Sequence, residues 1–335
     1  MDPVSQGVFG SLWAQAGSRR APLKQTVIAG WLAGMAPDLD VLIRSSDDAL
    51  LALDYHRHFT HSIAFAPVGG LIVGLALSPL MKRTMGFGAL YLSCFLGYLS
   101  HGLLDSFTSY GTSLYLPFST ERVAFNWISV IDPLFTLPLL ILLAIAMLTK
   151  QRSWLWGGAL WATLYLGAAG WQHQQALEAT KQWVHSRGLQ VERIVAKPSF
   201  ANIILWRGLI DTGSHFQTLA IRLVPGQDPS ITPGDRVTAL RLETQAPAGS
   251  RLRRDLERFD HFSAGWLFSY PPAADSDDVF VGDFRYAIDP ASARPLWGIT
   301  YSPTKPQSGV DFVRLRQIDK SAREQFWSRL LGQTR

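Results

Sequence analysis

The stretch Tyr55-His56-Arg57-His58-Phe59-Thr60-His61-Ser62 places three histidines directly before an apolar run that covers residues 62–81. Pro37-Asp38-Leu39-Asp40 precedes this stretch, and His101-Gly102-Leu103-Leu104-Asp105 follows it at the end of a second apolar run. Neutral imidazole nitrogens and carboxylate oxygens are ligands for divalent metals. An ionisable residue at membrane depth is costly, so its presence there indicates a function. The three motifs therefore predict a metal site at the ends of membrane helices.

The first half of the chain predicts an α-helical polytopic membrane domain with five to six transmembrane helices. The protein has 47% hydrophobic and only 17% charged residues, whereas soluble proteins carry about 25% charged residues. A transmembrane helix needs about 20 apolar residues. Six segments qualify by composition, and the first of them is short enough to lie flat in the membrane interface: 4–16, 24–43, 62–81, 86–104, 128–148 and 154–171.

The second half predicts a small β-rich soluble domain. Its apolar runs are short and are bounded by Gly, Pro and Asp, which is typical of strands joined by turns, and residues 321–331 predict a closing helix. We therefore expect a membrane-embedded domain with the metal site over residues 1–171 and a β-rich domain over residues 172–335. The single cysteine, Cys94, excludes an intrachain disulfide.

The basic residues near the apolar runs predict the orientation in the membrane. Cytoplasmic loops of membrane proteins are enriched in Lys and Arg, and with six alternating spans all the basic clusters fall on one face. The metal motifs and the β-rich domain would then lie on the outer face of a bacterial cytoplasmic membrane. The net charge of +5 thus marks topology and does not argue for nucleic acid binding. The clusters are Arg19, Arg20 and Lys24, then Lys82 and Arg83, then Lys150 and Arg152.

Each motif also has an ordinary structural explanation. His101 and Asp105 share one helix face at a spacing of four, and such a pair is also common at helix ends. Pro37 and Asp38 can simply stop one helix and cap the next. Arg57 can pair with a carboxylate or bind a phosphate oxygen, or it can be a solvated loop charge. The metal interpretation depends on coincidence, because three His and four Asp positions from four segments converge on one face.

Taken together, the motifs resemble a family of bacterial inner-membrane proteins described as predicted metal-dependent hydrolases, some of which are named for regulation by the SOS repressor. The resemblance covers about residues 1–150 motif by motif, and it reaches the second half through Ile204-Leu205-Trp206-Arg207 and Gly282-Asp283-Phe284-Arg285-Tyr286. Besides the motifs above, it is carried by Met1-Asp2-Pro3, Tyr110-Gly111-Thr112, Pro117-Phe118-Ser119 and Ile131-Asp132-Pro133.

The resemblance implies a divalent metal held by the matching His and Asp positions, and hydrolytic chemistry. One position departs from the family pattern. The family usually has a His near the N-terminus, in a pattern like Asp-x-x-Thr-His, where this chain reads Asp2-Pro3-Val4-Ser5-Gln6. Gln is a poorer ligand than His, so either this position is not a direct ligand or one of two metal sites is weakened here.

We therefore expect a membrane-bound hydrolase in which metal-activated water cleaves an ester or phosphodiester, with a lipid as the substrate. Asp40 would accept the proton and Arg57 would hold a substrate oxyanion or phosphate. The mixed ligand set suits Zn²⁺ or Mn²⁺, as one or two ions. The alternatives are a metal-binding scaffold or regulator without turnover and, ranked last, a metal or small-solute transporter. The expected metal ligands are His56, His61, His101, Asp105, Asp38 and Asp132.

Overall fold

A computed structural model describes residues 1–17, 20–271, 277–315 and 320–333. Arg19, one of the basic residues used above to predict orientation, lies outside these ranges. The chain divides into two compact units, which are described separately below. Unit 1 comprises residues 1–43, 55–171 and 200–203, and unit 2 comprises residues 44–54, 172–199 and 204–335.

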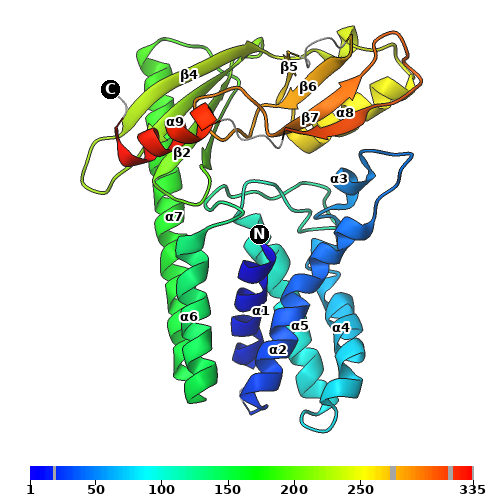
Figure 1. Cartoon of the computed structure of the whole chain (residues 1–335), viewed down its shortest axis with the longest axis vertical. Coiled ribbons are helices and arrows are strands. Elements are labelled where there is room, and N and C mark those ends of the chain that lie inside the picture. Colours follow the sequence, from blue (N-terminus) through cyan, green and yellow to red (C-terminus); the bar gives the residue numbers. More distant parts are fainter. Residues whose placement is uncertain (18–19, 272–276, 316–319, 334–335) are drawn as a thin grey trace. The chain divides into compact units, whose positions relative to one another are not determined.

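Unit 1 is helical (Figure 1). Helices α1, α2, α4 and α5 pack against one another, and α6 packs against α1. Between them lie two short 3-10 helices, η1 and η2, which carry the Asp and His motifs. The elements are α1 (Pro3–Gly17), α2 (Leu23–Met35), η1 (Ala36–Leu42), η2 (Phe59–His61), α4 (Ala66–Met81), α5 (Phe87–Ser106), α6 (Pro133–Thr149) and the first part of α7 (Ser153–Ser186).

Glycines bring the backbones of α1, α2 and α5 into close contact. A Cβ atom built on Gly10 would lie 2.5 Å from the carbonyl oxygen of Gly30, and one on Gly34 would lie 2.5 Å from that of Gln6. A Cβ on Gly97 of α5 would lie 2.7 Å from the same Gly30 oxygen. Small residues at helix interfaces permit such close approach. These three helices therefore hold the residues at their ends at fixed spacing.

The expectation of five to six transmembrane helices is wrong. Among the described residues, only α5 is long and apolar enough to cross a membrane, and the count rises to two if Leu51–His61 and Ala66–Met81, which meet at 89°, form one span. Three of the apolar runs, 24–43, 62–81 and 128–148, are longer than the helices they contain. In the run 24–43, the helix α2 ends at Met35. Helices α1, α2, α4 and α6 have 15, 13, 16 and 17 residues, fewer than the about 20 residues that a span needs. The predicted membrane orientation required six alternating spans, so it is no longer supported.

Unit 1 nevertheless displays large apolar side chains on its surface. Leu71, Ile72 and Leu75 of α4 are exposed, and so are Leu137 and Ile141 of α6. Soluble monomers rarely present contiguous apolar patches of large size, and such patches mark contact with a membrane or a partner.

Unit 2 contains two four-stranded antiparallel sheets, with strand orders β1-β2-β3-β4 and β5-β6-β7-β8. Its aromatic core includes Phe216, Trp266, Phe268 and Phe284. The helices are the second part of α7, α3 (Leu51–Tyr55) at the unit boundary, η3 (Leu242–Thr244), α8 (Arg251–Ser263) and α9 (Lys320–Leu331). The strands are β1 (Arg193–Pro198), β2 (Leu205–Asp211), β3 (His215–Arg222), β4 (Ser230–Thr238), β5 (Leu267–Tyr270), β6 (Val279–Asp283), β7 (Trp297–Tyr301) and β8 (Asp311–Arg314).

Candidate metal centre

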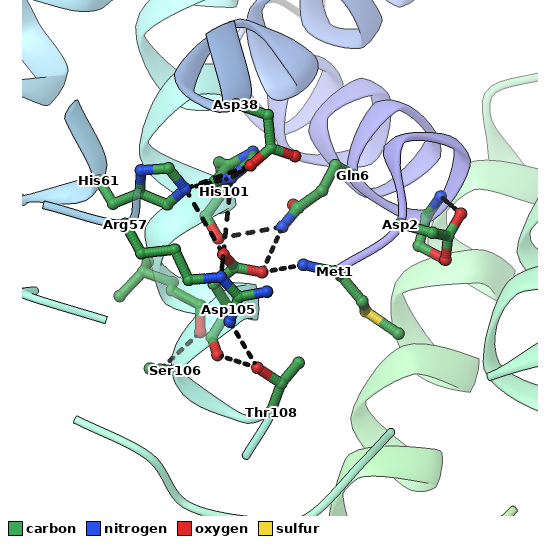
Figure 2. Close-up of polar contacts among 12 residues, drawn as sticks. Met1, Asp2, Gln6, Asp38, Arg57, His61, His101, Asp105, Ser106 and Thr108 are labelled. Atoms are coloured by element: carbon green, nitrogen blue, oxygen red, sulfur yellow. Dashed lines mark hydrogen bonds and ion pairs between the residues drawn. The ribbon is translucent and has the colours of Figure 1, made fainter. Parts of the chain in front are cut away.

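Three elements of unit 1 bring the Asp and His motifs together (Figure 2). Pro37 sits in the first turn of η1, which continues α2 and carries Asp38 and Asp40. His61 ends η2, and His101 and Asp105 lie one turn apart on α5. Gly102 permits the approach of η2 to α5, because a Cβ atom there would collide with the carbonyl oxygen of His61.

Four residues form the principal group: Asp38, His61, His101 and Asp105 each place one ligand atom within 4.8 Å of all the others. The Nε2 atoms of His61 and His101 are 2.9 Å apart. Asp38 Oδ1 lies 3.4 Å from each of these nitrogens. Asp105 Oδ2 lies 3.5 Å from His61 Nε2 and 3.7 Å from His101 Nε2. Two imidazole nitrogens and two carboxylate oxygens therefore converge on one point.

The outer nitrogens of both rings are already engaged. His101 Nδ1 lies 2.6 Å from the carbonyl oxygen of Gly34, which can only accept, so this nitrogen carries the proton. His61 Nδ1 lies 3.2 Å from a carboxylate oxygen of Asp40 and 3.0 Å from the hydroxyl of Thr60. Both rings thus direct their Nε2 atoms at each other, and two facing lone pairs repel unless a proton or a metal cation lies between them. Metal-bound histidines typically donate the other ring N–H to a carboxylate or a backbone carbonyl.

The carboxylates supply negative charge to this point. His61, His101 and Asp105 are buried, whereas the side chain of Asp38 remains 23% exposed. Burial alone would raise the pKa of Asp38, but its contacts with His101 and His61 hold that pKa well below the usual value. Asp105 Oδ1 accepts hydrogen bonds from Gln6 Nε2 at 2.9 Å and from the nitrogen of Met1. Among the described residues, no donor makes a hydrogen bond to Asp105 Oδ2, although the guanidinium of Arg57 forms an ion pair with it.

A second group, Asp38, Asp40 and His56, also has ligand atoms within 4.8 Å of one another. Asp40 is surrounded by donors. Its Oδ2 accepts from the backbone N–H of Arg57 at 3.0 Å and from Thr60 Oγ1 at 2.9 Å, and its Oδ1 lies 2.8 Å from His56 Nδ1. Burial raises the pKa of Asp40, but the bonds from His56 and His61 outweigh it and lower that pKa. Asp40 is therefore an anion that orients both histidines.

Arg57 is buried, with a left-handed φ of 62°. Its Nε lies 3.0 Å from Asp105 Oδ2, without the alignment of a hydrogen bond, and its NH1 donates to Thr108 Oγ1 at 2.9 Å. Its guanidinium also lies over the ring of Tyr110. Of the three uses that the sequence left open for Arg57, the structure shows pairing with a carboxylate.

Gln6 reaches the centre from α1. Its Nε2 donates to Asp105 Oδ1, while its Oε1 is buried and accepts no hydrogen bond from the described residues. Gln6, the residue that departs from the family pattern, thus lies beside the carboxylate of Asp105. Its side chain, with the acceptor Oε1, points toward the group of four Asp and His residues (Figure 2).

Asp132 belongs to neither group of ligand atoms. It caps α6, where its carboxylate accepts from the backbone N–H of Phe135 at 3.3 Å and from the hydroxyl of Tyr165 at 2.9 Å. Burial raises the pKa of Asp132. The Asp-Pro sequence at residues 132–133 is a helix-start signal, and the structure uses it in this way.

Two contacts of the centre have no signal in the sequence. The carbonyl oxygen of Gly34 fixes the ring of His101, but any residue carries such a carbonyl. Thr108 holds Arg57 from a loop, at a position that no motif singles out. Thr60, by contrast, stands out within the histidine stretch as a hydroxyl neighbour of His61.

A comparison with protein families matches residues 1–176, more than half of the chain, to the family described as the YdjM inner membrane protein. The chain belongs to this family. The YdjM family is the LexA-regulated, membrane-associated family, so the resemblance carried by the sequence motifs is confirmed. The chain is thus a YdjM-family membrane protein whose fold gathers a buried group of Asp and His residues able to hold a metal ion.

A relative in Bacillus subtilis (strain 168) is described as the uncharacterized protein YfhP. It is 26% identical to this chain over 292 residues, which cover 84% of each protein. No solved structure matches the chain significantly.

Proposed function

We propose that this chain is a membrane-associated, metal-dependent hydrolase that cleaves an ester or phosphodiester bond of a lipid. Asp38, His61, His101 and Asp105 would hold a divalent ion, with Zn²⁺ or Mn²⁺ the best match to this mixed ligand set. His56 and Asp40, together with Asp38, would form a neighbouring group that binds a second ion or handles protons.

The observation that carries the proposal is the pair of facing Nε2 atoms, 2.9 Å apart. Each of these rings has its other nitrogen engaged with an oxygen, and two carboxylate oxygens lie within 3.7 Å of the pair. A helix-end polar pair would explain His101 with Asp105, but it would not explain why His61 and Asp38 aim at the same point.

A divalent metal at such a site polarises the bond to be cleaved and lowers the pKa of bound water to about 7. The residues of this chain would do the rest. Asp40 keeps the His61 ring in place, and Arg57 neutralises part of the charge of Asp105. His56, whose side chain is 26% exposed, is positioned by Asp40 to receive a proton, as a histidine held by a carboxylate does in other hydrolases.

Substrate would approach from the side of Asp38 and His56, because the other members of the group are buried. The membrane family and the exposed apolar surface of unit 1 support a lipid-borne substrate. A substrate phosphate or oxyanion that reached Arg57 would share its guanidinium with Asp105.

The test begins with the full chain purified in mild detergent. Bound metals are measured by elemental analysis, and hydrolysis is measured with bis(4-nitrophenyl) phosphate, 4-nitrophenyl esters and bacterial lipid extracts. We expect at least one Zn²⁺ or Mn²⁺ per chain and metal-dependent turnover, both lost in His101→Ala. His58→Ala is the matched control, because this histidine lies in the same stretch but outside both ligand groups. Wild-type protein without bound metal after incubation with either ion would refute the proposal.

One observation favours a second candidate, a metal-binding scaffold or regulator without turnover. Structural metal sites are closed, whereas catalytic sites keep a position open, and three of the four residues in the principal group are buried. Stoichiometric metal with no turnover on any of the esters, phosphodiesters or lipids would select this candidate.

A further inference from the structure

Unit 1 contains an apolar cavity of about 540 Å³ between α1 and the first part of α7. Aliphatic and aromatic side chains line it from both helices, and Phe107, just beyond the end of α5, contributes as well. Ligand pockets in proteins typically have volumes of about 300–1,000 Å³. On the helices the lining includes Phe9, Leu12, Trp13, Leu155, Ala159 and Leu166.

The cavity is elongated. Its lining residues on α7 extend from Leu155 to Leu166, and Arg152 adds a further residue just before the helix. At a rise of about 1.5 Å per residue, the eleven steps from Leu155 to Leu166 correspond to about 16 Å along α7. A lining of this length, apolar over most of its course, matches an extended hydrocarbon chain better than a compact ligand.

The two ends of the cavity differ. At one end, Phe9 follows Gln6 by about one helical turn, and Phe107 follows Asp105 by two residues. At the other end, Arg152 donates from NH1 to Gln15 Oε1 at 2.8 Å and from NH2 to the carbonyl oxygen of Ala21. None of the lining residues belongs to the ligand groups, so the cavity begins next to the candidate metal centre without being part of it. The guanidinium at the far end is engaged by protein oxygens.

The surface around the cavity is also apolar. Trp156, Leu160 and Leu164 of α7 are each more than half exposed, and the chain belongs to an inner-membrane family. The natural supply of hydrocarbon chains at such a surface is the lipid of the membrane itself.

We propose that this cavity holds one acyl chain of a membrane lipid, with the polar head directed toward the candidate metal centre and the chain end toward Arg152. The direction of the head rests on the proposed function, whereas occupation of the cavity by a chain does not. Chain length would then contribute to substrate selection, because a longer chain buries more apolar surface along α7.

Photocrosslinking of the full chain in phosphatidylcholine nanodiscs tests this directly. Two phosphatidylcholine probes carry a diazirine on the palmitoyl chain, one near the ester and one at the chain end. We expect the near-ester probe to label the region of Phe9, Phe107 and Leu166, and the chain-end probe to label the region of Leu155. The reverse order along α7, or labelling spread evenly over the exposed face, would overturn the proposal.

A filled cavity provides the matched comparison. Ala159→Trp places an indole inside the lining, and Leu160→Trp places the same indole on the exposed face one residue away. Labelling of the lining should fall several-fold in Ala159→Trp and stay near wild type in Leu160→Trp. Equal labelling in the two variants would contradict the proposal. Ala159→Leu provides a milder filling in case the larger side chain prevents folding, and the thermal unfolding temperature of each variant in nanodiscs reports that the chain is folded.

Failure of the hydrolase proposal would be seen separately. If wild-type protein is labelled in the expected order but has neither bound metal nor turnover, the acyl-chain proposal is supported and the hydrolase proposal is refuted. If turnover is present, Ala159→Trp should lower kcat/KM for long-chain esters several-fold and spare short-chain 4-nitrophenyl esters. An equal loss on both substrates would count against the chain site.

Discussion

The candidate metal centre of unit 1 and the Asp283–Arg285 cluster of unit 2 are both buried and charged, but they differ in how their polar atoms are paired. In unit 2, Arg285 donates to both carboxylate oxygens of Asp283, at 2.8 to 3.2 Å, and Trp297 Nε1 adds a third donor at 3.1 Å. In unit 1, two imidazole nitrogens face each other. Asp105 Oδ2 beside them accepts no hydrogen bond from the described residues and has Arg57 Nε at 3.0 Å. The first cluster is paired by protein atoms, whereas the second gathers ligand atoms that could hold a metal ion.

The two clusters come from sequence motifs that are equally conspicuous. The run 282–286 invites a functional interpretation as readily as the run 55–62 does. The contacts of Asp283 and Arg285 show a buried charge pair at the end of β6. Burial and charge alone therefore do not mark a candidate metal site, whereas His and Asp ligand atoms that meet at one point do.

Asp105→Ala should have the largest effect, because it removes a ligand and also leaves Arg57 buried beside no carboxylate. Breaking a buried ion pair costs about 3–5 kcal/mol, and we expect bound metal to be lost as well. Elemental analysis and urea unfolding of the full chain measure the two effects. A variant that retains stoichiometric metal would remove Asp105 from the centre.

Arg285→Ala should destabilise the protein by a similar amount, about 3–5 kcal/mol, but without loss of metal. It leaves the fully buried carboxylate of Asp283 without its main partner. The double variant Asp283→Leu with Arg285→Met serves as the control, because replacing both members of a buried pair by apolar residues is often neutral. Loss of metal in Arg285→Ala would show that the clusters do not differ in the way described.

Asp40→Asn should weaken metal binding about 10- to 100-fold, because groups that orient metal-bound histidines have effects of this size. The amide retains the shape of Asp40 but not the negative charge that holds His61 and His56. Metal titration followed by calorimetry measures the change. An affinity equal to that of wild type would mean that Asp40 has no part in orienting the ligands.

Asp132→Ala should have the smallest effect. The variant loses the cap of α6, which costs about 1 kcal/mol, and we expect it to keep its metal. Asp132→Asn is the matched control, since Asn caps helices about as well as Asp does. Loss of metal in both variants would return Asp132 to the set of ligands.

The sequence singled out side chains that the structure brings together, but it misjudged the helices around them. His101 and Asp105 could be paired from their spacing on one helix, and Asp38 and His61 from the residue types that metals require. Asp132 has the same residue type but lies at a helix start, and only its neighbours Phe135 and Tyr165 reveal that its oxygens are already engaged. Residue type predicts which atoms can bind a metal, and packing decides which of them lie close enough to share one.

The helix count failed for a different physical reason. Hydropathy is summed over consecutive residues, and residues 24–43 are apolar overall whether or not all of them are helical. The structure changes from α2 to η1 at Ala36, just before Pro37, and it keeps α7 helical as far as Ser186, well beyond the apolar part that ends near residue 171. Elements that end at a proline or continue into polar sequence are thus misjudged by apolar length.

Gly102 has a consequence for how this protein tolerates mutation. Even a methyl group at this position would meet the carbonyl oxygen of His61 and push η2 away from α5. In a saturation scan, position 102 should therefore be as intolerant as the histidines, although glycine offers no side-chain atom to bind or react with anything. The absence of a side chain at Gly102 would then be as important to this protein as the presence of the histidine side chains.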